Sequence, residues 1–445
     1  MPHRNALVLA AMLALLLPAG ALRAQRPTSA AQQPTPGAIS KADRESALGI
    51  LDDVSKGIQK LYYDPKMKGL DWNAVIASAR AKIVASNSMN EALMQIAVAV
   101  STLNDSHTRF EPPARPYSID FGFEYQLIWN RCFVTRVRPG SDAEAKGLKP
   151  GGEILTMNGI APNRQNFQNI QYLNYILDPR PDMQLEMRYP SGEKNLKVTA
   201  KLTLSADLAY RPGAGVRYDM YRGYENVIHR MRMQHVYFGD VGILKFPWFF
   251  YDADEFYTLS GKIRKDRGLI VDLRGNPGGA DDTLKYFIGM FFDHDVKLGD
   301  KVERKKTSLE IAKSERHIYF PGKVIVLVDS KSASAAEIFA RVMQLEKRGT
   351  VIGDHTSGSV MEATDLYFAT SGANYGAEVT IADLIMTDGK SIEHLGVNPD
   401  EVVLPKLADL ESGRDPVLAY AAQKLGVTIS PEDAGKLFPY EWPKD

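Results

Sequence analysis

The chain has 445 residues, of which 44% are hydrophobic and 24% charged, as is typical of folded globular proteins with more than one domain. Its 54 basic and 54 acidic residues cancel, and no long run of Lys and Arg is present, so nucleic acid is not an expected partner. The single cysteine, Cys132, excludes an internal disulfide and any metal site built from several cysteines.

The first 24 residues predict a secretory signal peptide, because Arg4 precedes an apolar run at 6–17 that is followed by small residues. This run is shorter than the roughly 20 residues of a membrane-spanning helix, so we expect cleavage and no stable span afterwards; a retained anchor is the alternative. Residues 25–40 are rich in Pro, Ser, Thr, Gln and Ala and predict a disordered spacer. The protein is therefore expected to be exported, either to a periplasm or into the medium.

Residues 41–110 predict a helical subdomain. Ser88 and Glu91 have the spacing of a capping box, and apolar residues follow at helical intervals. The pattern ends in a polar stretch that contains Ser106 and His107, so this pair is expected where a helix ends.

Residues 117–205 predict a separate, mostly β module with short strands at 133–137 and 153–157. The stretch 137–159, with its Pro-Gly and Gly-Gly turns, closely resembles a PDZ domain. In that family a glycine-containing loop binds a peptide's terminal carboxylate while the peptide adds a strand to the sheet. The resemblance places this loop at Phe121, Gly122 and Phe123, which are the candidate peptide-binding residues.

Asp120 departs from the PDZ pattern, because it stands where the first glycine of the loop is usual. An acidic side chain beside a bound carboxylate is unfavourable. Carboxylate capture is therefore an open question at this site.

Residues 206–405 predict an α/β core in which buried strands alternate with helices. The expected strands are 241–246, 268–273 and 324–328, and the expected helices are 253–265 and 281–292. Residues 406–445 predict a helical tail, in which Asp415 caps a helix that starts at Pro416.

Two motifs of this core are candidates for chemistry. Asp272-Leu-Arg-Gly-Asn-Pro-Gly-Gly279 is a glycine-rich turn after a strand, whose amides can hold an oxyanion or a phosphate. It lacks the Gly-Lys-Ser/Thr of a nucleotide loop, which disfavours phosphate, and a purely structural turn is the alternative.

The second motif is a strand-to-helix corner with serines at 330, 332 and 334. A serine there lies near the positive end of the helix dipole and beside free backbone N–H groups, which suits a nucleophile. Plain N-capping by serine is the alternative.

Taken in order, the helical start, the PDZ-like insert, the Asp-Leu-Arg-x-Asn-x-Gly-Gly turn and the Ser-Ala-Ser-Ala-x-Glu corner resemble the carboxyl-terminal processing and tail-specific serine proteases of family S41 and their relatives around the tricorn protease core. The resemblance covers residues 41–405 and implies a crotonase-like (ClpP/crotonase) α/β core with endopeptidase activity and no cofactor. It also implies that Ser334 is the nucleophile and that the amides of Gly278, Gly279 and Ala335 form the oxyanion hole.

The Ser-Lys branch of this family carries a lysine where the chain has Ser359. The resemblance to the Ser-His-Ser-Glu branch instead implies that His107 is the base, supported by Ser106 and Glu393. Imidazole, with an ordinary pKa of roughly 6.5, is suited to accept the Ser334 proton.

Three other bases stay open: Lys331, His355 and His394. The eight histidines show no His-x-x-x-His or His-Glu-x-x-His spacing, so no metal is expected.

The sequence thus predicts an exported serine endopeptidase that acts on polypeptides recruited by a PDZ-like domain, with their C-terminal tails as the candidate feature recognised. One alternative is a proteolytically inactive, peptide-binding scaffold of the same fold. Another is a ligand carrier that uses a crotonase-like pocket.

Overall fold

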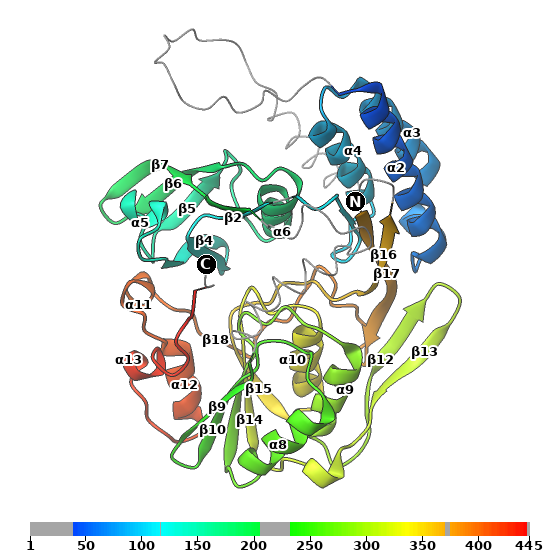
Figure 1. Ribbon diagram of the computed structural model, residues 1–445. Helices are drawn as coiled ribbons and strands as arrows, with labels where there is room; N and C mark the ends of the chain where they lie inside the picture. The colour runs from blue at the N-terminus through cyan, green and yellow to red at the C-terminus, as the bar shows by residue number, and fades with distance from the viewer. Residues whose placement is uncertain (1–38, 116, 205–231, 370–373, 443–445) are drawn as a thin grey trace.

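The computed structural model describes residues 39–115, 117–204, 232–369 and 374–442. The expected signal peptide and all but the last two residues of the expected spacer lie outside the described residues. Figure 1 shows N-terminal helices on one side, a small β domain on the other, and a larger α/β body below them. In the described part of the chain, no helix is long and apolar enough to cross a membrane.

Three helices open the described chain, namely α2 (Lys41–Leu61), α3 (Trp72–Ala85) and α4 (Met89–Ser101). At the start of α4 the Ser88 hydroxyl accepts the Glu91 N–H at 3.2 Å, as expected. The Glu91 carboxylate, however, accepts the N–H of Asn87 at 2.7 Å rather than that of Ser88. The expected capping box is therefore only half formed.

These helices pack against a five-stranded sheet and do not form a core of their own. The shared core joins Ile58 and Ile96 of the helices to Phe110, Tyr375 and Val379 of the sheet. The N-terminal helices are therefore held by strands from near the other end of the chain. The sheet consists of β1 (Arg109–Glu111), β17 (Asn374–Met386), β12 (Val296–Glu303), β13 (Thr307–Ala312) and, paired with β17, β16 (Glu362–Ala369).

A six-stranded sheet forms the centre of the α/β body. Its order is β18-β15-β14-β11-β10-β9, and every neighbouring pair is parallel except β9 with β10. All three strands expected in this region are present. The strands are β9 (Gln234–Phe238), β10 (Val241–Lys245), β11 (Gly268–Asp272), β14 (Lys323–Val328), β15 (Gly349–Gly353) and β18 (Glu401–Val402).

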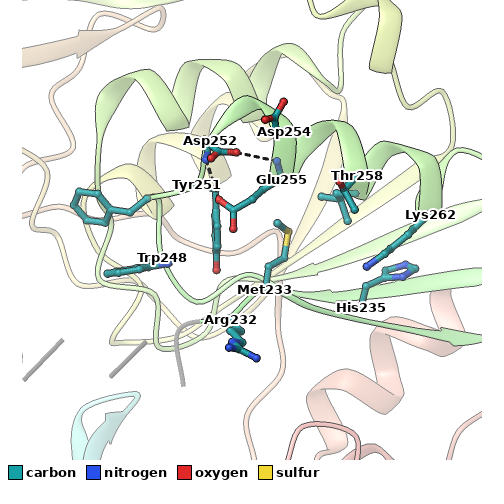
Figure 2. A pocket seen from close by; sticks show the side chains of 12 residues that line it. Arg232, Met233, His235, Trp248, Tyr251, Asp252, Asp254, Glu255, Thr258 and Lys262 are labelled. Atoms are coloured by element: carbon teal, nitrogen blue, oxygen red, sulfur yellow. Dashed lines mark hydrogen bonds between the residues drawn. The ribbon is translucent and has the colours of Figure 1, made fainter. Parts of the chain in front are cut away.

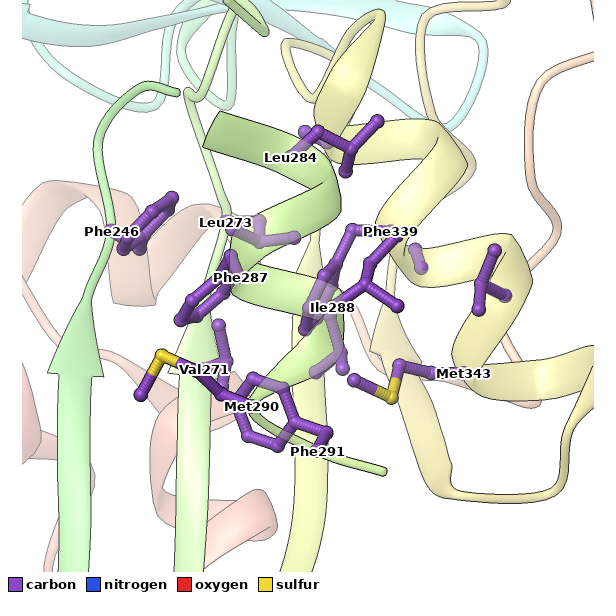
Figure 3. Close-up of a cluster of buried hydrophobic side chains, with 14 of the residues drawn as sticks. Phe246, Val271, Leu273, Leu284, Phe287, Ile288, Met290, Phe291, Phe339 and Met343 are labelled. Atoms are coloured by element: carbon purple, nitrogen blue, oxygen red, sulfur yellow. The ribbon is translucent and has the colours of Figure 1, made fainter. Parts of the chain in front are cut away.

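Helices cover both faces of this sheet. Alternate residues of its strands point to opposite faces, and on each face they pack with helix residues in a separate apolar cluster. On one face the rings of Phe246 and Phe287 stack at 4.2 Å, and Phe339 lies 4.9 Å from Phe287 (Figure 3). Truncation of such a buried ring costs about 3–5 kcal/mol. This face carries α8 (Ala253–Ile263), α9 (Asp281–Gly289) and α10 (Ala335–Leu345), and the other carries α12 (Pro416–Lys424) and α13 (Pro431–Ala434).

The C-terminal segment is part of this body. Asp415 caps α12 by accepting the Leu418 N–H at 2.9 Å, as expected. Val417 and Leu418 are buried against the sheet, so α12 forms one of its covering layers.

The β domain has a core of its own, built around Tyr125, Val134, Leu185 and Val198. Its sheet has the order β3-β4-β5-β6-β7, which places β3 at an edge. The strands are β3 (Phe123–Ile128), β4 (Arg131–Val137), β5 (Glu153–Met157), β6 (Asp182–Tyr189) and β7 (Gly192–Thr199), and β2 (Tyr117–Asp120) pairs separately with β8 (Lys201–Leu204). Two short helices, α5 (Asp142–Ala145) and α6 (Phe167–Tyr172), complete the domain.

Candidate active site

Three loops meet where the parallel strands β11, β14 and β15 end, which is where open α/β sheets commonly hold their sites. The loop after β11 is tied to the corner after β14 by a hydrogen bond from Ala333 N to Asn276 O at 2.9 Å. That corner is tied to the loop after β15 by a bond from Ser334 N to Ser359 O at 2.7 Å. Both predicted motifs therefore lie side by side at this edge of the sheet, next to the loop after β15.

Ser334 occupies a strained backbone position at the start of α10. Its φ is +54° and its ψ is −121°, a combination that residues other than glycine rarely adopt. A sharp strand-to-helix turn of this kind lifts a nucleophilic hydroxyl out of the sheet. The side chain is partly exposed, so a substrate can reach it.

The other two serines of the corner have structural roles. Ser332 is fully buried, and its hydroxyl donates to Leu273 O at 2.8 Å while it accepts the Asp329 N–H at 2.9 Å. The Ser330 hydroxyl donates to Leu127 O of the β domain. Ser332 therefore braces the corner and does not cap α10, whose N-cap residue is Ser334. Ser334 remains the candidate nucleophile.

A buried carboxylate, Glu337, holds this corner together. It accepts hydrogen bonds from Thr356 Oγ1 (2.5 Å), Gly358 N (2.7 Å), Ser359 N (2.9 Å) and Ser334 N (3.1 Å). Burial raises its pKa to about 7, against the effect of these donors. In the sequence this glutamate stands out only as the third residue of a helix. Its role in the corner could not be predicted, because three of its four partners come from the loop after β15.

Gly278 lies against the candidate nucleophile, whereas Gly279 lies against the backbone of Phe249. A Cβ at Gly278 would stand 2.6 Å from Ser334 Cβ and 3.1 Å from Ala335 N. The Gly278 N–H donates to Asn276 Oδ1 at 2.8 Å, so this amide is engaged within the chain, and its role as an oxyanion donor stays a prediction. Ala335 is the first residue of α10, where an N–H has no partner within its own helix.

The Asp-Leu-Arg part of the glycine-rich motif is structural. Arg274 forms an ion pair with Asp272 at 2.8 Å and another with Asp415, the cap of α12, at 2.7 Å. Desolvation would raise the pKa of the buried Asp272, but the positive charges of Arg274 and Lys245 hold it well below its ordinary value. Arg274 thus anchors the loop after β11 to the start of α12.

His107 and its two predicted supporting residues come together from opposite ends of the chain. Ser106 Oγ lies 2.7 Å from His107 Nδ1 and donates to Glu393 Oε2 at 2.9 Å. The backbone N–H of Ser106 donates to Glu393 Oε1 at 2.7 Å. The Glu393 side chain is only 8% exposed, which strengthens these contacts.

The direction of these hydrogen bonds fixes the tautomer of His107. The Ser106 hydroxyl has one proton, and that proton goes to the Glu393 carboxylate. Ser106 Oγ must then accept from His107, so Nδ1 carries the ring proton. Nε2 is consequently the basic nitrogen.

The His107 ring stays neutral over a wide pH range. Burial, aided by the positive charge of Arg109, lowers its pKa to about 4, while Asp105 acts in the opposite direction. Asp105 itself is tied down by Tyr62 and Thr380, whose hydroxyls donate to it at 2.6 and 2.7 Å. The histidine is thus a free base near neutral pH.

A continuous hydrogen-bond path connects His107 to the Ser334 corner. Glu393 Oε2, which accepts from Ser106, also accepts the Val360 N–H at 2.9 Å. The preceding residue, Ser359, accepts the Ser334 N–H through its carbonyl. Within the described residues, however, no hydrogen bond joins His107 directly to Ser334.

The three alternative bases have other partners. Lys331 Nζ lies 3.5 Å from Glu124 of the β domain. His355 Nδ1 is 2.8 Å from Thr356 O, and His394 Nε2 is 2.9 Å from Asn104 O. Of the three, only His394 also touches the path that links His107 to the corner, because its Nε2 lies 3.5 Å from Glu393 Oε1.

The β domain docks on the same loops. The Trp129 N–H donates to Asp354 Oδ2 at 2.7 Å, and Arg164 forms an ion pair with Asp354 at 3.1 Å. Gln168 Nε2 donates to Ser357 Oγ at 2.8 Å. Asp354 and Ser357 both belong to the loop that contains Ser359, so the β domain lies beside the candidate site.

The predicted peptide-binding residues lie at the start of β3. Phe121 and Phe123 are 3% and 5% exposed and belong to the core of the β domain. The Gly122 N–H donates to Asp120 Oδ1 at 2.7 Å. This amide is therefore already occupied within the chain.

A cavity of about 560 Å³ lies next to the loop after β11, and neither Ser334 nor His107 lines it. Figure 2 shows its wall, which includes Trp248, Tyr251, Glu255, His235 and Lys262. The aromatic segment 248–251 contributes to this wall, and Phe249 within it forms a β-bridge with Gly279. None of the predicted catalytic residues lines this cavity.

Metal and thiol chemistry find no support in the described part of the chain. The described residues hold no group of three or more His, Cys, Asp or Glu side chains that could bind a metal ion. Cys132 is buried, and burial raises the pKa of its thiol.

A serine on a strained strand-to-helix turn, backbone amides beside it, and an imidazole oriented by a serine and a glutamate together form the kind of arrangement that serine hydrolases use. Comparisons with known proteins give the family. Residues 240–403 match the family model described as Peptidase family S41. This segment of the chain, from β10 to β18, is therefore similar to a family of serine peptidases.

Two curated relatives illustrate the relationship. The chain is 27% identical to the carboxy-terminal processing protease CtpA of Bacillus subtilis (strain 168) over 279 residues, which cover 61% of this chain and 53% of the relative. It is 33% identical to a probable CtpA-like serine protease of Staphylococcus haemolyticus over 155 residues, which cover 33% of this chain and 30% of the relative. The chain thus spans about half or less of the length of these relatives.

Solved structures support the mixed α/β fold. The crystal structure of mature CPAF aligns with a TM-score of 0.63 at 15% identity and covers 83% of this chain and 95% of that one. The structure of mature CPAF complexed with lactacystin aligns with a TM-score of 0.62 at 15% identity and covers 89% and 99%.

Proposed function

We propose that this chain is a serine endopeptidase that hydrolyses peptide bonds of polypeptides. Ser334 attacks the carbonyl carbon, and His107 Nε2 takes the serine proton and later gives it to the leaving amine. Ser106 and Glu393 hold the imidazole in the required tautomer and stabilise the imidazolium that forms. No cofactor is needed for this chemistry.

In this proposal the oxyanion is stabilised by the N–H groups of Ala335 and Gly279. Ala335 N lies at the positive end of α10, next to the attacking hydroxyl. Gly278 lets the two loops approach closely, because any Cβ there would meet Ser334.

The observation that carries the proposal is the path of hydrogen bonds from Ser334 to His107. It passes through the loop after β15 and through Glu393, and so unites three segments of the chain. A scaffold without catalysis would have no need of a serine and a glutamate that fix one tautomer of a buried histidine.

We further propose a finer organisation. The core is crotonase-like, and residues 117–204 form a PDZ-like domain that recruits polypeptides. The protein is exported, with residues 1–24 as its signal peptide and a spacer at 25–40. The docking of the β domain on the loop that holds Ser359 supports a role in substrate delivery.

Purified wild type and Ser334→Ala, tested on an unstructured polypeptide, decide the proposal. Wild type should release internal fragments, and Ser334→Ala should lose at least a thousandfold of the rate. Ser308→Ala, which alters a distant strand, is the matched control and should keep full activity. Equal cleavage by wild type and Ser334→Ala would refute the assignment of the nucleophile.

The second candidate is a proteolytically inactive, peptide-binding protein of the same fold. It is favoured by one observation, the lack of a hydrogen bond between His107 and Ser334 within the described residues. The same assay separates the two functions, because an inactive scaffold would bind peptides while neither variant cleaves them.

A further inference from the structure

We infer that the PDZ-like domain of this chain takes internal extended segments of polypeptides and does not require a free carboxy-terminal carboxylate. The inference rests on the proposed function, because it names the class of substrate segment that is delivered to Ser334. It distinguishes an enzyme that selects chain ends from one that selects exposed extended stretches.

The loop that would hold a carboxylate already contains one. Asp120 Oδ1 accepts the Gly122 N–H at 2.7 Å. Backbone N–H groups of this loop are the donors that a PDZ-type site offers to the end of a peptide. The chain therefore supplies its own anion to the position where a ligand's terminal carboxylate would bind.

The nearby positive charge is also engaged. Arg138 forms an ion pair with Asp120 Oδ2 at 2.7 Å, and its guanidinium lies 4.9 Å from the ring centre of Trp442. A second carboxylate would have to displace Asp120 from both Gly122 and Arg138, and it would face repulsion between like charges. This arrangement disfavours the chain end as the recognised feature.

The edge of β3 offers a different mode of recognition. Among the described strands, β3 has β4 as its one ladder partner, so the part of its other edge that precedes Leu127 can accept an extended segment by strand addition. At Leu127 the β3 carbonyl reaches Ser330, which lies four residues before Ser334. A segment that pairs along β3 is thus led toward the candidate nucleophile.

The length of β3 fits this delivery. From Gly122 to Gln126, before the carbonyl that Ser330 occupies, an extended strand spans about 13 Å, which a segment of about four residues would cover. Because Asp120 satisfies the amide at the far end, the bound segment has no need to end there. The polypeptide can continue past the domain in both directions.

Peptide binding to Ser334→Ala tests the inference, since this background keeps the peptides intact and does not depend on catalysis. The probes are two fluorescent, Val/Thr-rich peptides of one sequence, one with a free carboxy terminus and one amidated. We expect equal affinity within about twofold. In Ser334→Ala/Asp120→Gly, which frees the amide, the free-carboxylate peptide should bind at least tenfold more tightly than the amide.

Two further variants control the charge and the fold. Asp120→Asn keeps an acceptor for Gly122 without the charge and should gain less preference than Asp120→Gly. Asp182→Asn removes an acid that pairs with Lys197 elsewhere in the domain and should change nothing.

Three results would overturn the inference. They are a tenfold preference for the free carboxylate with Asp120 in place, no gained preference in Asp120→Gly, and no binding of either peptide. None of them bears on whether wild type cleaves proteins, so failure here is separate from failure of the proposed function.

Discussion

The carboxylate of Glu393 accepts two hydrogen bonds from Ser106, one from its N–H at 2.7 Å and one from its hydroxyl at 2.9 Å, across 287 positions of sequence. This bidentate contact fixes the hydroxyl proton of Ser106. It thereby decides which nitrogen of the neighbouring imidazole is basic. The catalytic competence that we propose depends on this contact more than on any other.

Removal of either supporting residue should therefore reduce turnover without preventing substrate binding. For Ser106→Ala and Glu393→Gln we expect kcat to fall by about 10²–10⁴-fold with little change in KM, because the wrong tautomer of His107 becomes populated. Steady-state cleavage of a quenched fluorescent peptide measures both constants. Rates within threefold of wild type in both variants would refute a role for this pair.

The pH dependence should show two separate protonations. His107 must be neutral to act, and its pKa of about 4 places the half-maximal loss of kcat/KM near pH 4 rather than near 6.5. Glu337, with a pKa of about 7, is ionised above that pH, and its carboxylate then accepts hydrogen bonds and donates none. Its protonation turns one acceptor into a donor and should lower the rate partly as pH falls through 7.

Glu337→Gln isolates these two stages. Its amide always presents a donor to the surrounding N–H groups, so its activity should be reduced already at pH 8 and should show only the lower stage. A wild-type profile with one limb near pH 6.5 would contradict the assignment.

Stability should also depend on the protonation of His107. The unfolded imidazole binds a proton near pH 6.5, whereas the folded one binds it only near pH 4. The stabilising contribution of the buried neutral ring is thus complete above pH 6.5 and is lost as pH falls toward 4. Urea unfolding of wild type and His107→Gln across this range should show the difference, and identical pH profiles would count against it.

A methyl group at Gly278 should disable the site while the fold survives. Its Cβ would lie 2.6 Å from Ser334 Cβ, at a φ of +100°. We expect Gly278→Ala to lose at least a hundredfold in kcat with retained secondary structure by circular dichroism. Gly275→Ala is the matched control, because it has a φ of +76° but no atom within 4 Å of its Cβ. Similar losses in both variants would show that backbone strain, not contact with the serine, is responsible.

The C-terminal segment should hold the β domain in place. Tyr440 donates to Glu124 at 2.8 Å and lies 4.5 Å from the Arg136 guanidinium, beside the Arg138 and Trp442 pair. Cation–π contacts contribute about 0.5–1 kcal/mol each at exposed sites. We expect Tyr440→Ala/Trp442→Ala to increase hydrogen exchange in β3 and β4 but not in β11 or β14.

The control for this double variant is Tyr257→Ala, which removes a ring that is 65% exposed on α8. Its exchange pattern should match that of wild type. Unchanged exchange in the double variant would mean that the tail does not restrain the β domain.

Much of the fold was predictable, because its signals are local. The buried strands at 241–246, 268–273 and 324–328 show in the sequence as apolar runs, and Asp415 before Pro416 marks a helix start. The expected helix at 281–292 ends instead at Gly289. A Cβ at this glycine would lie 2.1 Å from Lys313 O, so a distant strand end packs there in a way that no local pattern reveals.

The site was predictable only in part. Ser334 and His107 carry motifs, but the N–H of Gly278 is taken by Asn276, and three of the four partners of Glu337 come from a loop that meets it only in three dimensions. The core that the N-terminal helices share with β17 could likewise not be predicted, because it joins segments that are far apart in the sequence. Residues that act through nonlocal hydrogen bonds leave no periodic pattern in the sequence.

Labelling with a fluorophosphonate tests the central claim most directly, because it reports on the activated hydroxyl without any choice of substrate. Mass spectrometry should find the label on Ser334, and the labelling rate should fall at least a hundredfold in His107→Gln but stay unchanged in His355→Gln and His394→Gln. A label on another serine, or equal rates in wild type and His107→Gln, would contradict the account.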